Sequence, residues 1–161
     1  MIQIRIAVTK DHHSIWKIIH EVISGGDTYV FAPDSSRKEM LDYWCGEDKH
    51  TYVAEIGNEI VGTFIITDNF PGLGSHVANA SYMTLPSSFG KGIGRTMCEF
   101  SLSEAKLLGY RAMQFNIVVK TNERAIRLWQ KLGFEIIGNI PEAFHHRTEG
   151  YIDACIMWRK L

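Results

Sequence analysis

The stretch from residue 77 to residue 109 constrains the fold more than any other part of the chain. Residues Val77–Leu85 have a strand pattern, which Pro86 ends because proline cannot donate to a sheet ladder. Glycines then alternate from Gly90 to Gly94, and a helical apolar pattern follows up to Gly109. Such a turn points backbone N–H groups and the positive end of the helix at one place. The segment predicts an α/β fold with an anion site at this turn, unless the glycines serve only the turn itself.

The rest of the chain alternates between strand and helix patterns. Strands are predicted, from apolar alternation and bounding turn residues, at Ile2–Val8, Thr51–Ile56, Glu59–Thr67, Arg111–Val119, Phe134–Ile140 and Tyr151–Trp158. Helices are predicted, from helical apolar spacing and capping residues, at Asp11–Ser24, Ser36–Cys45 and Asn122–Leu132. With the helix that the glycine turn opens at about Ile93 and Gly109 ends, this order predicts a single α/β domain over residues 1–161. In it, about four helices cover both faces of a sheet of about seven strands.

Composition limits the partners that the chain can have. The 17 Lys and Arg residues nearly balance the 18 Asp and Glu residues, so no overall field draws the protein to nucleic acid or to an anionic membrane. No apolar run approaches the ~20 residues that cross a bilayer. The three cysteines, Cys45, Cys98 and Cys155, lack paired spacing and are expected to be free thiols of a cytoplasmic protein. The histidine pairs His12–His13 and His145–His146 predict no metal site, because adjacent histidines on a regular element point in different directions.

A second motif lies in the C-terminal half of the chain. Residues Asn122–Phe134 read N-x-x-A-x-x-L-W-x-x-L-G-F directly after a predicted strand. Together with Leu85–Gly94, this segment resembles the two coenzyme-binding motifs of the GNAT superfamily, the acetyl-CoA-dependent N-acetyltransferases. The order of elements along the whole chain is similar too. The resemblance implies a splayed mixed sheet, in which the strands Val77–Leu85 and Arg111–Val119 diverge and acetyl-CoA occupies the gap between them.

The resemblance also implies a coenzyme site. The family pattern places the pyrophosphate of acetyl-CoA on the backbone amides of Gly90, Lys91, Gly92, Ile93, Gly94 and Arg95. The pantetheine arm is expected to add like a short strand near Met83 and Thr84. Asn122 matches the asparagine that contacts the coenzyme arm in the family, and it is also a natural helix N-cap. The two roles of Asn122 are compatible.

One position near the glycines departs from the family pattern. Phe89 stands where the family commonly has Gln or Arg, so one polar phosphate contact is missing. Four nearby cations could bring positive charge to the coenzyme phosphates instead, and each is otherwise an ordinary surface residue. They are Lys91, Arg95, Lys120 and Arg124.

A second departure concerns proton transfer. Trp129 stands where many family members have a tyrosine that protonates the departing thiolate, and indole is no acid near neutral pH. The proton then comes from another group or from water, or is not needed, because a thiol leaves with a pKa of about 8 to 9. Trp129 itself is expected to pack against the coenzyme and the core.

Two carboxamides lie within the strands that are expected to diverge. Asn79 and Asn116 occupy sheet positions where an apolar residue is the default. A buried amide has to be hydrogen-bonded to backbone, water or substrate. Both residues are therefore candidates for orienting the acceptor amine, with structural hydrogen bonding as the alternative. Two segments with aromatic residues are expected to lie over the acceptor site, Tyr29–Phe31 and, by the resemblance, the polar loop with Phe144–Arg147.

These features predict an N-acetyltransferase that acts on the primary amine of a small metabolite, by direct attack in a ternary complex with acetyl-CoA. The run from Gly133 to Phe144 resembles bacterial and fungal family members that acetylate amino acids or toxic analogues. Two alternatives stay open: a protein N-terminal or lysine acetyltransferase, and a domain that binds acyl-CoA as a sensor without catalysis. No nucleic acid, membrane or metal is expected as a partner. A cytoplasmic location and a homodimer are further expectations.

Overall fold

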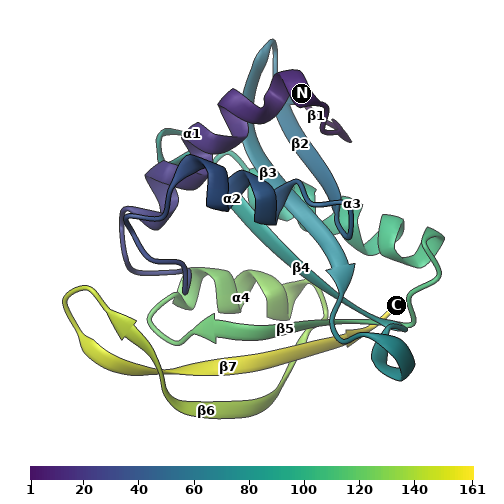
Figure 1. The fold of residues 1–161 in the computed structure, drawn as a ribbon. Coiled ribbons are helices and arrows are strands. Elements are labelled where there is room, and N and C mark those ends of the chain that lie inside the picture. The colour runs from purple at the N-terminus through teal and green to yellow at the C-terminus, as the bar shows by residue number, and fades with distance from the viewer.

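The sheet contains seven strands in the order β1-β2-β3-β4-β5-β7-β6 (Figure 1). The computed structural model describes residues 1–161. Its strands are β1 (Ile2–Ile6), β2 (His50–Ile56), β3 (Glu59–Asp68), β4 (Val77–Thr84), β5 (Ala112–Val119), β6 (Glu135–His146) and β7 (Gly150–Lys160). Neighbouring strands pair antiparallel except β4 and β5, which are parallel. The mixed α/β sheet predicted from the sequence is confirmed.

Four helices cover the two faces of the sheet: α1 (His12–Ile23), α2 (Arg37–Trp44), α3 (Ile93–Leu107) and α4 (Glu123–Lys131). Successive residues of a strand point to opposite faces, and β3 shows the division. Phe64 belongs to the core packed against α3 and α4, whereas Ile65 belongs to the core packed against α1 and α2. The longest helix, α3, has 15 residues, and no helix has the length and apolarity that a bilayer crossing requires.

The parallel strands β4 and β5 separate soon after they begin. Only two residue pairs align, Val77 with Ala112 and Ala78 with Met113. Beyond Ala78, β4 stays paired with β3 up to Thr84, while β5 continues alongside β7. Figure 1 shows β4 and β5 meeting near the C-terminus and diverging away from it. One edge of β4 is therefore left without a strand partner, and the splayed gap implied by the family resemblance is present.

The last hairpin differs from the prediction. The sequence predicted a strand up to Ile140 and then a polar loop containing Phe144–Arg147, but β6 continues to His146. Its pairing with β7 is irregular between Ile140 and Phe144, where Glu142 has a φ of 48°, and it resumes with Phe144 opposite Ile152. A bulge and a proline within an edge strand hide its alternation, so one long strand looks like a strand and a loop. The turn itself is reduced to residues 147–149.

Candidate active site

The glycine turn lies between β4 and α3, at the wide end of the splayed gap. Gly90 and Gly92 have φ angles of 84° and 79°, a left-handed conformation that favours glycine. A Cβ at either position would meet no atom within 4 Å, so the space above the turn is open. Gly92 is also the N-cap of α3, and the first N–H groups of a helix have no partner inside it. The turn therefore combines unpaired amides with room for a phosphate group.

Arg124 lies beside this turn without an ion-pair partner. The other three candidate cations have polar partners of their own: Arg95 with Glu99, Lys120 with Asp153, and Lys91 with the Ser88 hydroxyl. The guanidinium carbon of Arg124 lies 5.3 Å from the centre of the Phe89 ring, within the range of a cation–π contact. Phe89 is 56% exposed. The exposed Phe89 ring, at the position where the family commonly has Gln or Arg, therefore contacts a cation that has no ion-pair partner, Arg124.

Backbone hydrogen bonds show which β4 residues face the gap. Successive residues of a strand direct their backbone groups to opposite edges. The Val77 carbonyl accepts a hydrogen bond from the N–H of Asn69, which follows β3. The His76 carbonyl accepts one from the N–H of Arg111, which precedes β5. Even-numbered residues of β4 therefore face the gap. Of the two residues predicted for the pantetheine arm, Thr84 presents its backbone there, while Met83 presents its backbone to β3 and its side chain to the core of α1 and α2.

Tyr29 reaches the gap from the connection between α1 and α2. Its hydroxyl donates a hydrogen bond to the Tyr82 carbonyl and accepts one from the Tyr82 N–H at 3.0 Å. Both backbone groups lie on the free edge of β4. Burial raises the pKa of the Tyr29 phenol, so the hydroxyl stays protonated. The sequence indicated only an aromatic loop here, because 53 residues separate the two partners and no local signal links them.

Asn116 belongs to a chain of three carboxamides. Its Nδ2 donates to Asn69 Oδ1 at 2.8 Å, and Gln114 Nε2 donates to Asn116 Oδ1 at 2.9 Å. A carboxamide has two N–H donors and an oxygen with two lone pairs. Asn116 therefore keeps one N–H and one lone pair for another partner. Structural hydrogen bonding was the alternative role predicted for Asn116, and it is present. It leaves part of the hydrogen-bonding capacity of the side chain unused.

Asn79 and Asn116 point to the same face of the sheet. Asn79 lies between Ala78 and Ala80, which pack in the core of α3 and α4, and Asn116 follows Phe115 of that same core. Because strand residues alternate between faces, both asparagines point toward the side of α1 and α2. Neither belongs to the apolar core under those helices, and Asn79 makes no side-chain hydrogen bond in the structure. The fold thus places the two residues on the strands that border the gap.

Trp129 packs on the face of the sheet opposite to the one that carries Asn79 and Asn116. Its ring centre lies 5.1 Å from that of Tyr82 in β4 and 5.2 Å from that of Phe115 in β5, so the indole packs against both diverging strands. The residue is buried, and the core packing predicted for it is confirmed. The Tyr82 hydroxyl lies 2.6 Å from Ser101 Oγ, and burial raises the pKa of Tyr82 well above its usual range. Neither aromatic residue is an acid near neutral pH.

Asn122 begins α4, as the sequence predicted. Its Oδ1 accepts a hydrogen bond from the Ala125 N–H at 3.3 Å, which satisfies one of the unpaired donors at the helix start. The position follows β5 directly, so the cap lies at the wide end of the gap. The capping role of Asn122 is confirmed, and its carboxamide nitrogen makes no further hydrogen bond.

The connection between α1 and α2 meets the turn between β6 and β7. The Arg147 N–H in the β6–β7 turn donates to the Gly26 carbonyl at 3.1 Å, and Figure 1 shows this turn beside the α1–α2 connection. In that connection the Tyr29 ring stacks on Phe31 at 6.3 Å between centres, and Phe31 contacts Tyr43 of α2. The connection that carries Tyr29–Phe31 and the turn that carries Arg147, both expected to lie over the acceptor site, are therefore in contact through Gly26.

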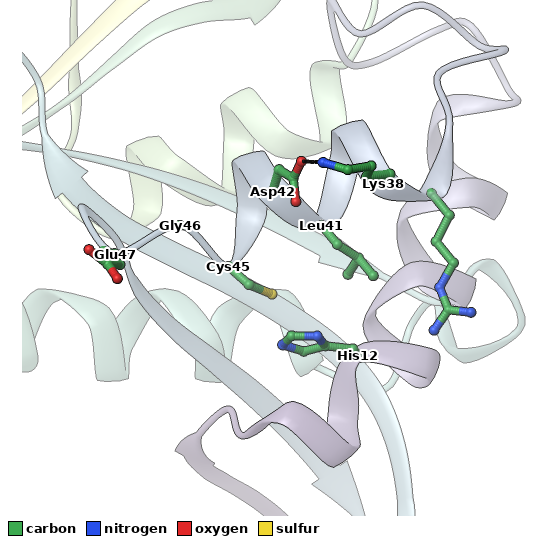
Figure 2. Close-up of a pocket in the computed structure, with 8 residues that line it drawn as sticks. His12, Lys38, Leu41, Asp42, Cys45, Gly46 and Glu47 are labelled. Atoms are coloured by element: carbon green, nitrogen blue, oxygen red, sulfur yellow. Dashed lines mark hydrogen bonds and ion pairs between the residues drawn. The ribbon is translucent and has the colours of Figure 1, made fainter.

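A surface cavity of about 610 Å³ lies apart from the gap, beside α1 and α2 (Figure 2). His12 and Cys45 line it, and an ion pair between Lys38 and Asp42 borders it. Burial raises the pKa of the Cys45 thiol, which keeps the thiol protonated and weakly reactive. None of the predicted coenzyme or catalytic residues lines this cavity, so it is not the predicted site.

The sequence matches the model of the Acetyltransferase (GNAT) family over residues 16–134. The chain belongs to this family. Its members use acetyl-CoA as the acetyl donor, which agrees with the open glycine turn and the unpartnered edge of β4. The fold predicted from the two motifs is therefore confirmed as the GNAT fold.

Individual relatives agree with this assignment. The structure of a GCN5-related N-acetyltransferase from Kribbella flavida is 39% identical with a TM-score of 0.94, covering 99% of this chain and 98% of that one. A GNAT superfamily phosphinothricin acetyltransferase from Sinorhizobium meliloti, solved with acetyl-CoA, is 25% identical with a TM-score of 0.86, covering 99% and 88%. N-acetyltransferase aca1 of Schizosaccharomyces pombe is 40% identical over 98 residues, which are 60% of this chain and 47% of that protein. The match thus spans about half the length of this curated relative.

Proposed function

We propose that this GNAT family member transfers the acetyl group of acetyl-CoA to the primary amine of a small metabolite, an amino acid or an analogue of one. The observation that carries the proposal is the splayed gap, with the open glycine turn at one end and two asparagines on its acceptor face. Bound acetyl-CoA supplies an activated acetyl thioester, which the amine attacks directly in a ternary complex. No covalent enzyme intermediate is needed.

The coenzyme half of the site consists mostly of backbone. The pyrophosphate binds to the amides of Gly90, Lys91, Gly92, Ile93, Gly94 and Arg95, where the turn and the start of α3 leave N–H groups unpaired. Thr84 offers its gap-facing backbone to the pantetheine arm, and Met83 anchors the same strand to β3. Asn122 adds its free carboxamide nitrogen. Arg124, which lies against the Phe89 ring, supplies the polar phosphate contact that the family commonly obtains from a Gln or Arg at the position of Phe89.

Asn116 and Asn79 orient the acceptor. Asn116 keeps one N–H and one lone pair, and the whole carboxamide of Asn79 is free. Such groups suit an acceptor with both an amine and a carboxylate, because amide N–H groups donate to the carboxylate and amide oxygens accept from the amine. An α-amine has a pKa of about 8 and loses its proton with modest help. Water or a polar strand residue takes that proton.

The acceptor side favours a small molecule over a peptide. The contact between Gly26 and Arg147 joins two segments over the face that carries both asparagines. An extended peptide needs an open groove there. The relative from Sinorhizobium meliloti, whose name gives phosphinothricin as its acceptor, supports a small acceptor as well.

We further propose that the protein is a cytoplasmic homodimer. The free thiols of all three cysteines suit a reducing compartment. Ile136 and Ile137 expose apolar side chains on β6, which is the edge strand of the sheet, and Tyr151 does so on β7. Exposed apolar surface at an edge favours self-association. Size-exclusion chromatography with light scattering tests this part, because a mass of one chain excludes the homodimer.

A thiol-release assay tests the function. Purified protein is incubated with acetyl-CoA and a panel of amino acids, amino acid analogues, polyamines, aminoglycosides and peptides, and free CoA is measured. Release with an amino acid or analogue, with the N-acetyl product found by mass spectrometry, supports the proposal. Release with peptides alone supports a protein acetyltransferase. A thermal shift by acetyl-CoA without release for any amine supports a sensor domain.

A further inference from the structure

The Tyr29 hydroxyl binds the free edge of β4 at a single residue, Tyr82. It contacts both backbone groups of Tyr82 that face the gap, the N–H as acceptor and the carbonyl as donor. These are the groups that a neighbouring strand would bind, so the phenol replaces a strand at this single position. An unpaired backbone group buried in a sheet edge is unfavourable. The contact therefore stabilises the edge in the free protein.

The coenzyme needs the same edge. A pantetheine arm that starts at the glycine turn meets Thr84 first and Tyr82 next, because only alternate residues of β4 face the gap. The donor that Tyr82 presents to the gap is its backbone N–H, and a coenzyme carbonyl oxygen that lies beside Tyr82 accepts from it. The Tyr29 hydroxyl already uses that N–H. The Tyr29 oxygen and a coenzyme carbonyl oxygen cannot both accept a hydrogen bond of good geometry from the Tyr82 N–H.

We propose that the Tyr29 hydroxyl competes with the thioester carbonyl of acetyl-CoA for the Tyr82 N–H, so that coenzyme binding releases Tyr29 from the edge of β4. The inference rests on the proposed placement of acetyl-CoA in the gap. Tyr29 is thus a positioning residue that links the two halves of the site, since the segment it releases belongs to the acceptor side. The phenol stays protonated, so the competition does not depend on its ionisation.

The surroundings of Tyr29 allow the hydroxyl to be removed without losing the ring. The ring stacks on Phe31, which in turn contacts Tyr43. Tyr43 belongs to the same aromatic group, but its hydroxyl makes no hydrogen bond, and it is 43% exposed. Tyr43→Phe is therefore a matched control for Tyr29→Phe, because each change removes one phenolic oxygen from this group and only one of them touches β4.

Calorimetric titration with acetyl-CoA and with CoA tests the competition. CoA has a free thiol and no thioester carbonyl. Tyr29→Phe is expected to bind acetyl-CoA about three- to tenfold more tightly than wild type, with CoA affinity unchanged, since a hydrogen-bonded competitor worth about 1 kcal/mol has been removed. The unliganded variant is expected to melt at a lower temperature than wild type, because the Tyr82 backbone loses its partner. Tyr43→Phe is expected to change neither affinity.

The opposite results overturn the proposal. Acetyl-CoA affinity that is unchanged or weaker in Tyr29→Phe shows that the hydroxyl does not compete. An equal gain in affinity for acetyl-CoA and CoA shows that the Tyr29 hydroxyl obstructs the pantetheine arm, which both ligands have, and not the thioester carbonyl. In wild type, amide hydrogen exchange of residues 26–36 is expected to accelerate with acetyl-CoA and not with CoA, and no acceleration also contradicts the inference. Because no amine is present, failure of acetyl transfer with every amine would refute the proposed function and leave these results standing.

Discussion

The two halves of the splayed gap are built in different ways. The proposed coenzyme half is largely one continuous segment, from Thr84 to Arg95, and it depends on the backbone conformation of glycines. The proposed acceptor half gathers side chains from separate parts of the chain, which are Tyr29, Asn69, Asn79 and Asn116, and it adds the backbone contact of Arg147 with Gly26. A backbone site tolerates little change of shape, whereas a side-chain site can lose one group and keep the rest. Substitutions in the first half are therefore expected to reduce coenzyme affinity, and those in the second to reduce turnover.

Gly92→Val is expected to have the largest effect. Gly92 has a φ of 79° and open space above it, so valine both strains the turn and fills the phosphate position. We expect acetyl-CoA affinity to fall about a hundredfold or more, which corresponds to about 3 kcal/mol. Gly57→Val is the matched control, because Gly57 has a φ of 63° in the β2–β3 turn and also has no neighbour. Calorimetric titration checks both, and equal losses in the two variants would mean that strain alone is responsible.

Asn116→Ala is expected to have the next largest effect, and on the other half of the gap. It removes the N–H and lone pair proposed to meet the acceptor, and a hydrogen bond to a charged group contributes about 1.5 to 3 kcal/mol. We expect turnover or acceptor KM to worsen roughly ten- to a hundredfold, with acetyl-CoA affinity nearly preserved. Asn139→Ala is the control, since Asn139 donates to Asp153 on the exposed side of β6. A lower melting temperature with normal kinetics would assign Asn116 a structural role only.

Arg124→Gln is expected to have a moderate effect that is confined to the coenzyme. The change removes the unpaired cation from the Phe89 ring, so acetyl-CoA affinity is expected to fall about three- to tenfold, and less so at high salt. Arg127→Gln is the control, because Arg127 lies on the same helix and pairs with Glu123 at 2.9 Å. In the Arg124→Gln background, Phe89→Arg is expected to restore affinity. If Arg124→Gln binds acetyl-CoA as wild type does, Arg124 is an ordinary surface cation.

Trp129→Phe is expected to have the smallest effect on turnover. The indole packs between Tyr82 and Phe115 and supplies no proton near neutral pH, so a phenyl ring keeps most of its contacts. We expect turnover within about threefold of wild type, and a lower melting temperature from the lost volume. Steady-state kinetics and thermal unfolding check this. A collapse of turnover with intact coenzyme binding would give the indole N–H a catalytic part.

The coenzyme half was more predictable than the acceptor half. The glycine spacing, Pro86 and the Asn122 cap are local signals, and each is found in the structure in the predicted place. The length of β6 was not predicted, because the irregularity around Glu142 interrupts the alternation while the ladder with β7 continues. Asn116 was singled out as a polar residue in a strand, but its partner Asn69 was not. That contact joins residues 47 apart in the chain.

The sequence by itself determined most of the elements and the glycine turn, since strand and helix periodicity and left-handed glycines are set by residues close together in the chain. The mixed sheet was implied by the family resemblance of the two motifs. Only the tertiary structure decided what lies across the gap. In it, the Arg124 guanidinium lies against the Phe89 ring, and the Arg147 N–H donates to the Gly26 carbonyl. The Tyr29 hydroxyl contacts the Tyr82 backbone. These contacts depend on where β4 and β5 part and on how the connecting segments return to the sheet. Neither is encoded by spacing along the chain.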